Sequence, residues 1–205
     1  MSLLRIRKRT NKLMAVMILI LALPGCRDVP VPRPRGYFRI DFPPKEYISS
    51  ESNPLSHKIP FLTEYPLYGN LTSGEGSNGE QGWFNIEFPA FKAKIYLTYK
   101  EIKNDLPSLI EQTYTMNVKN HISKADAINE EIISNGSSNV FGILYDLKGN
   151  TASAVQFYVT DSTKHYLRGS LYFNAEPNAD SLATVVEFLR KDIVHMIETL
   201  QWKAD

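Results

Sequence analysis

The residues with the most obvious catalytic chemistry lie in one short run, Asp161-Ser162-Thr163-Lys164-His165, with Arg168 close behind it. A hydroxyl, an imidazole and a carboxylate are the groups of a hydrolytic triad. Triad partners must approach one another from different directions, which neighbours in sequence rarely do, and Asp, Ser and Thr are also common hairpin-turn residues. We therefore predict a turn without catalytic residues. A hydrolase that uses Asp161 and His165 is kept as the alternative.

The same run carries cationic and aromatic side chains that suit contact with another protein. Arg and Tyr are enriched at the energetic centres of protein interfaces. We expect Lys164 and Arg168 to be exposed beside tyrosines such as Tyr166. The prediction is that Lys164, His165, Tyr166 and Arg168 contact a partner.

Other kinds of site have weaker support. The four histidines are scattered, without the helical His pairs or Cys spacings of metal sites: His57, His121, His165 and His195. The glycine-rich stretch 69–82 reads as a mobile loop, and no lysine follows it with phosphate-loop spacing. We predict no metal and no cofactor, and we keep a glycan-binding module that uses an aromatic face as a further alternative.

The only cysteine, Cys26, follows a segment typical of an export signal. Five basic residues precede an apolar run of eleven residues over 13–23. Crossing a bilayer takes about 20 apolar residues, so this run is short for a membrane span and matches the core of a signal peptide. The sequence Leu-Pro-Gly-Cys resembles a bacterial lipobox. We predict a lipoprotein signal peptide over 1–25 and lipid attachment at Cys26.

The rest of the chain has the composition of one anionic domain on a tether. Without the five basic signal residues, 18 basic residues face 22 acidic ones, which argues against nucleic-acid binding. Alternating prolines favour an extended tether over 26–36. We predict a single domain over 37–205. Because no acidic run follows Cys26, we place this domain on the periplasmic side of a membrane in the cell envelope.

Periodicity predicts an α+β fold. Two-residue alternation predicts strands over 38–42, 83–88, 93–99, 141–147, 155–159 and 167–173, and a proline-interrupted edge strand within 59–68. The segment 126–133 is ambiguous between helix and strand. Helical spacing predicts a shorter central helix over 106–114 and a long C-terminal helix with an apolar stripe from Leu182 to Leu200. We expect an antiparallel sheet of about six strands with both helices packed on it and one wet face.

Four stretches carry a family resemblance: 35–43, 88–100, 148–157 and 160–173, the last being TDSTKHYLRGSLYF. Together with the final helix ending at Trp202, they resemble the GldD family of gliding-motility lipoproteins of Bacteroidetes. The resemblance implies an envelope lipoprotein required for gliding, with partners in the gliding machinery and its associated protein-secretion apparatus. It implies no reaction and no catalytic residues. The element order is also loosely similar to a Mog1/PsbP-type sandwich, an analogy of fold alone.

Overall fold

The computed structural model describes residues 39–74, 82–174 and 178–203. From Ile40 onward the chain forms one compact unit. The predicted signal peptide over 1–25, Cys26, the tether over 26–36 and residues 75–81 of the glycine-rich loop lie outside the described residues. These assignments therefore stay predictions.

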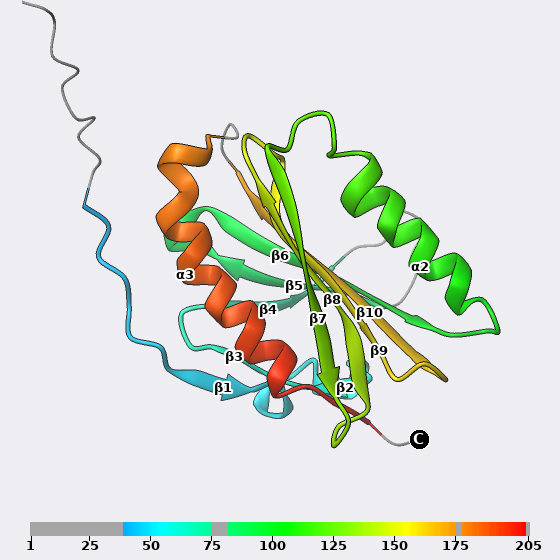
Figure 1. Cartoon of the computed structure of the whole chain (residues 1–205). Helices are drawn as coiled ribbons and strands as arrows, with labels where there is room; N and C mark the ends of the chain where they lie inside the picture. The colour runs from blue at the N-terminus through cyan, green and yellow to red at the C-terminus, as the bar shows by residue number, and fades with distance from the viewer. Residues whose placement is uncertain (1–38, 75–81, 175–177, 204–205) are drawn as a thin grey trace, which may run out of the picture. The chain divides into compact units, whose positions relative to one another are not determined.

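The centre of this unit is a seven-stranded antiparallel sheet with the order β4-β5-β6-β10-β9-β8-β7 (Figure 1). Its strands are Asn70–Ser73 (β4), Trp83–Phe88 (β5), Ala93–Glu101 (β6), Ala127–Asn135 (β7), Val140–Lys148 (β8), Ser153–Thr160 (β9) and His165–Phe173 (β10). The strands predicted over 141–147, 155–159 and 167–173 are confirmed as β8, β9 and β10, which pair in succession as an antiparallel meander. The ambiguous segment forms β7, which pairs with β8 at one edge of the sheet.

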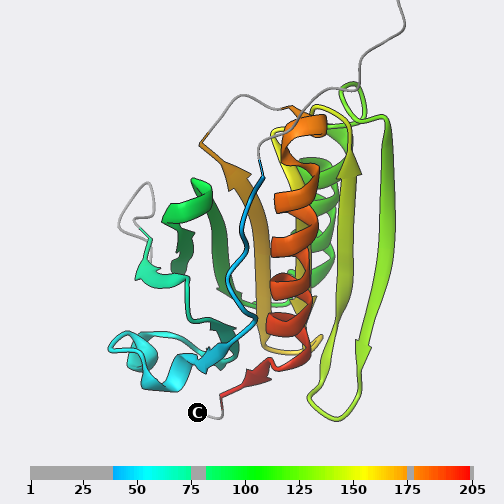
Figure 2. The same ribbon diagram turned by 90° about the vertical axis from the view of Figure 1, so that its left-hand side faces the viewer.

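Both predicted helices are present, and they lie on opposite faces of the sheet (Figures 1 and 2). The shorter helix, α2, spans Leu106–Tyr114 and continues as a π-helical segment, Thr115–Lys119 (η4). The longer helix, α3, spans Ala179–Glu198, and the Asn178 side chain caps its start by accepting from the N–H of Ser181. Among the residues that the structure describes, neither helix could serve as a membrane span.

Each helix closes a separate apolar core against the sheet. The larger core places α3 residues such as Leu189 and Ile193 against Ile95, Phe157 and Leu167. The smaller core places Leu109 of α2 and Val118 of η4 against a second set of sheet side chains: Tyr145, Leu147, Tyr158 and Tyr166. The sheet face that we expected to be wet is therefore partly covered by α2, while Tyr96 on the same face stays exposed.

The N-terminal part of the unit is built from short pieces. Its strands are Tyr47–Ser49 (β1), Phe61–Leu62 (β2) and Glu64–Pro66 (β3), and its 3₁₀ turns are Ser50–Ser52 (η1) and Ser56–Lys58 (η2); a third turn, Pro89–Phe91 (η3), joins β5 to β6. β1 pairs with β3, and β2 pairs with the C-terminal Gln201–Trp202 (β11). The prediction of a strand over 38–42 is wrong for residues 39–42, because these residues form no strand. Phe42 instead stacks on Phe188 of α3, with ring centroids 4.3 Å apart.

Candidate functional site

The predicted turn joins β9 to β10, and Asp161 holds it closed. One carboxylate oxygen, Oδ1, accepts hydrogen bonds from the backbone N–H groups of Thr163, Lys164 and His165, at 3.0, 2.8 and 2.8 Å. Burial alone would raise the pKa of Asp161, but these hydrogen bonds outweigh it and hold the pKa below its usual value. The Asp161 carboxylate thus serves as the acceptor that shapes the turn.

The His165 ring is engaged in a structural contact with Tyr99 and Trp202. Its Nδ1 lies 2.8 Å from the hydroxyl of Tyr99, and its ring stacks on Trp202 with centroids 5.0 Å apart. Within the described part of the chain, no hydrogen bond joins the imidazole to the Asp161 carboxylate. The pairing that the hydrolase alternative requires is therefore not assembled, because the turn and the Trp202 contact occupy the two groups separately.

The four residues predicted to contact a partner do not form one surface. His165 and Tyr166 are buried, with 7% and 3% of their areas exposed, and successive residues of β10 point to opposite faces of the sheet. Arg168 is also mostly covered, so the expectation that it is exposed is wrong. The cause is α2, which packs on the face of the sheet that we expected to be wet. Partner contact stays a prediction, limited to the accessible parts of Lys164 and Arg168.

On the face covered by α2, Tyr166 and Arg168 belong to a buried polar network. The Tyr166 hydroxyl donates to Oγ1 of Thr113 at 2.7 Å. The guanidinium of Arg168 donates from Nη2 to Oδ1 of Asn117 and to Oε1 of Gln156, both at 3.1 Å. Sequence reasoning missed Asn117 and Gln156, whose role depends on the packing of η4 over β9 and β10.

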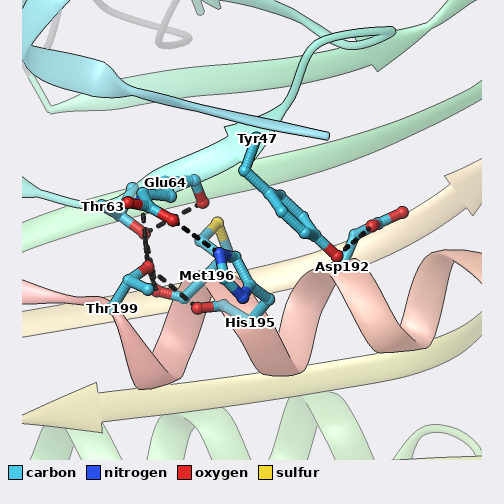
Figure 3. Close-up of polar contacts among 7 residues, drawn as sticks. All are labelled: Tyr47, Thr63, Glu64, Asp192, His195, Met196 and Thr199. Carbon is cyan, nitrogen blue, oxygen red and sulfur yellow. Dashed lines mark hydrogen bonds and ion pairs between the residues drawn. The ribbon is translucent and has the colours of Figure 1, made fainter. Parts of the chain in front are cut away.

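A second polar cluster surrounds Asp192 of α3, whose carboxylate is 1% exposed (Figure 3). Its Oδ1 lies 2.7 Å from Nζ of Lys45 and accepts a hydrogen bond from the Tyr47 hydroxyl at 3.0 Å. Its Oδ2 accepts a short hydrogen bond from the Tyr68 hydroxyl. Both carboxylate oxygens are thus occupied by groups from the N-terminal part of the unit.

The next turn of α3 extends this cluster (Figure 3). Nε2 of His195 lies 2.7 Å from Oε2 of Glu64, and the His195 ring stacks on Tyr47 with centroids 3.7 Å apart. Close by, the Thr63 hydroxyl donates to the Met196 carbonyl oxygen at 2.6 Å. These contacts fasten β1 and β3 to α3.

The electrostatics of the cluster match this fastening role. Burial, followed by the nearby Asp192 carboxylate, raises the pKa of Tyr47 to about 12. The same two causes raise the pKa of Tyr68 well above its usual value. Both phenols therefore stay protonated near neutral pH and act as donors to Asp192. Burial lowers the pKa of Lys45, although Asp192 opposes that shift.

One sequence signal could have pointed to Asp192. It lies three residues after Leu189 and four before Met196, which places a carboxylate inside the apolar stripe of α3. Its partners could not be read in the same way, because they come from short irregular pieces far away in the chain. Among the described residues, no three His, Cys, Asp or Glu side chains gather as metal ligands would.

Comparisons with known proteins bear on the family. A structural similarity links the chain to the solution structure of cyanobacterial PsbP (CyanoP) from Synechocystis sp. PCC 6803, at 10% identity and a TM-score of 0.46, covering 78% of this chain and 95% of that one. No curated protein matches the sequence. The family model described as gliding motility lipoprotein GldD matches residues 27–202, nearly all of the chain beyond the predicted signal peptide. The chain therefore belongs to the GldD family of gliding motility lipoproteins.

Proposed function

We propose that the protein is attached by lipid at Cys26 to a membrane of the cell envelope, with its domain in the periplasm. There it acts without catalysis, as an assembly or scaffold component of the gliding machinery and the associated secretion apparatus. The observation that carries this proposal is the match of the GldD family model over residues 27–202. A lipid anchor supplies stable membrane attachment without a transmembrane helix when more than one acyl chain is present.

The geometry of the β9–β10 turn supports the non-catalytic part of the proposal. Asp161 is used by three backbone N–H groups, and His165 is used by Tyr99 and Trp202. A general base needs hydrogen-bond reach to the proton that it abstracts. Both groups instead have structural partners, which favours a role in holding the shape of the domain.

A strain that lacks the protein and is complemented with single variants tests the proposal. We expect Cys26→Ala to leave the membrane fraction and to fail to restore gliding. We expect Asp161→Asn and His165→Gln to restore gliding at normal protein levels, because amide side chains retain hydrogen-bonding capacity at both positions.

Two outcomes would contradict the proposal. Normal gliding with a Cys26→Ala protein that stays in the soluble fraction would show that the lipid anchor is not required for function. Loss of gliding in Asp161→Asn, with the protein folded and present at normal level, would favour the periplasmic hydrolase over the scaffold.

A further inference from the structure

A cavity of about 300 Å³ lies between α2 and the sheet face that carries Arg168. Its sheet side includes a row of cross-strand neighbours, Trp83 on β5, Thr98 on β6 and Arg168 on β10, which pair in register. Leu109 of α2 and Met116 of η4 line the helical side. Small-molecule sites in proteins are mostly apolar cavities with a few placed polar groups and begin at about this size.

Arg168 brings a positive charge into this cavity without a negative partner. The Arg168 side chain is mostly covered, and its hydrogen bonds within the described structure go to two neutral amide oxygens, those of Asn117 and Gln156. Within residues 39–74, 82–174 and 178–203, no carboxylate forms an ion pair with it. Burial of a charge is costly unless the charge is paired, and here it lowers the pKa of Arg168.

The two amides that hold Arg168 leave donors unused. Asn117 and Gln156 are both 0% exposed, and in the described structure neither Nδ2 of Asn117 nor Nε2 of Gln156 has a hydrogen-bond partner. Buried donors of this kind are nearly always satisfied in folded proteins. The amide oxygens face the cation, and neither amide lines the cavity. Among the described residues, the cavity lining includes the cations Arg168 and Lys100 and no carboxylate, a set that suits an anion.

The backbone is also irregular at this place. Asn117 and Met116 lie in the π-helical segment η4, where the N–H of Asn120 donates to the Thr115 carbonyl oxygen at 3.0 Å. Short π-helical segments are rare and occur frequently at functional sites. The segment brings Asn117 to Arg168 and Met116 to the cavity.

We propose that this cavity binds a small carboxylate with an apolar or aromatic body. Nε and Nη2 of Arg168 donate to Asn117 and Gln156, so Nη1 is the nitrogen left to donate to a carboxylate oxygen. A single negative charge balances the single buried cation. Trp83, Leu109 and Met116 receive the apolar body, and the exposed Lys100 adds a positive charge at the cavity lining. This proposal is independent of lipid attachment at Cys26 and of the scaffold role.

The two tryptophans of the chain allow a direct test. In the full-length Trp202→Phe protein, kept in non-ionic detergent, Trp83 is the only tryptophan and reports on the cavity. We expect benzoate to change its fluorescence in a saturable way, and calorimetry to give the same affinity. Benzamide, which has the same shape without the charge, should bind at least about tenfold more weakly.

Variants made in the Trp202→Phe protein distinguish a cavity that recognises an anion from one that binds any apolar molecule of the right size. Arg168→Lys keeps the charge but loses the guanidinium N–H groups that donate to the two amides and to the ligand, so benzoate affinity should fall about tenfold. Lys100→Gln changes an exposed side chain at the cavity lining and should weaken benzoate binding severalfold. Lys148→Gln changes a side chain that is also exposed but does not line the cavity, and it should leave benzoate affinity unchanged. Equal binding of benzamide and benzoate, equal affinities of the two Lys→Gln variants, or no saturable response to benzoate would overturn the proposal.

Discussion

The carboxylate of Asp192 in the last helix lies 2.7 Å from the ammonium of Lys45, which precedes the first strand. The Lys45 ammonium also lies 3.3 Å from the centroid of the Phe188 ring, one turn earlier in α3. The start of the unit is thus bound to its final helix by a cation that is shared between a carboxylate and an aromatic ring. Several consequences of this arrangement and of the sheet can be measured.

Asp192→Ala should be strongly destabilising. It leaves the Lys45 ammonium and the hydroxyls of Tyr47 and Tyr68 without their shared acceptor, and removing one partner of a buried ion pair costs about 3–5 kcal/mol. The loss in unfolding free energy is measured by urea titration monitored by circular dichroism. Glu187→Ala, which changes an exposed carboxylate on the same helix, should stay within about 0.5 kcal/mol of the parent. Similar losses in both variants would contradict the assigned role of Asp192.

The stability of the protein should fall at high pH, in part through Tyr47. An unfolded tyrosine loses its proton near pH 10, whereas burial and Asp192 raise the pKa of Tyr47 to about 12 in the folded protein. The stabilising contribution is therefore complete below about pH 10 and is lost as the pH rises through the folded value. Unfolding free energies measured between about pH 9 and pH 11 should fall more steeply for the parent than for Tyr47→Phe. Equal slopes would mean that Tyr47 titrates normally.

Gly169→Ala should destabilise the larger core. A Cβ at position 169 would lie 2.1 Å from Cε1 of Phe157, and both residues are buried between the sheet and α3. Overpacking of this kind costs about 1–3 kcal/mol. Gly136→Ala is the matched control, because a Cβ there meets no atom within 4 Å. Thermal unfolding should show a lower midpoint temperature for Gly169→Ala and an unchanged one for Gly136→Ala. The double variant Gly169→Ala/Phe157→Leu should recover part of the stability that Gly169→Ala loses.

Asp161→Ala should loosen the β9–β10 turn without disrupting the sheet. The change removes the acceptor of three backbone N–H groups, and at this partly exposed position we expect a loss of about 1 kcal/mol. Asp161→Asn keeps an oxygen acceptor and should lose less. Amide hydrogen exchange at residues 163–165 measures the effect directly, as faster exchange in Asp161→Ala. Unchanged protection in Asp161→Ala would show that the carboxylate does not hold the turn.

Much of the architecture could be predicted because its elements have clear periodicity. The alternation of β8, β9 and β10 and the apolar stripe of α3 reflect one buried face each, and both were found from the sequence. The side of the sheet that α2 covers has no such local signature. Its packing buries Tyr166 and most of Arg168, and this is why the predicted exposure of Arg168 was wrong.

The residues before β1 show a different limit. Phe38, Ile40 and Phe42 alternate as in a strand, yet Phe42 packs onto Phe91 and Phe188 without entering a sheet. Alternation records which side chains are apolar, not whether a neighbouring strand offers hydrogen bonds. The Asp192 cluster was missed for a similar reason, because it joins short irregular pieces to a helix that is distant in sequence.

The fastening of the N-terminal segment to α3 has a mechanical consequence. Tension applied to the chain from its N-terminal side would load the stacking of Phe42 on Phe188 and the contacts of Asp192 with Lys45 and Tyr47. The hydrogen-bonded ladders of the seven-stranded sheet come later along this path. A force on the N-terminal side would thus act on the side-chain contacts with α3, and the sheet would stay intact until those contacts broke.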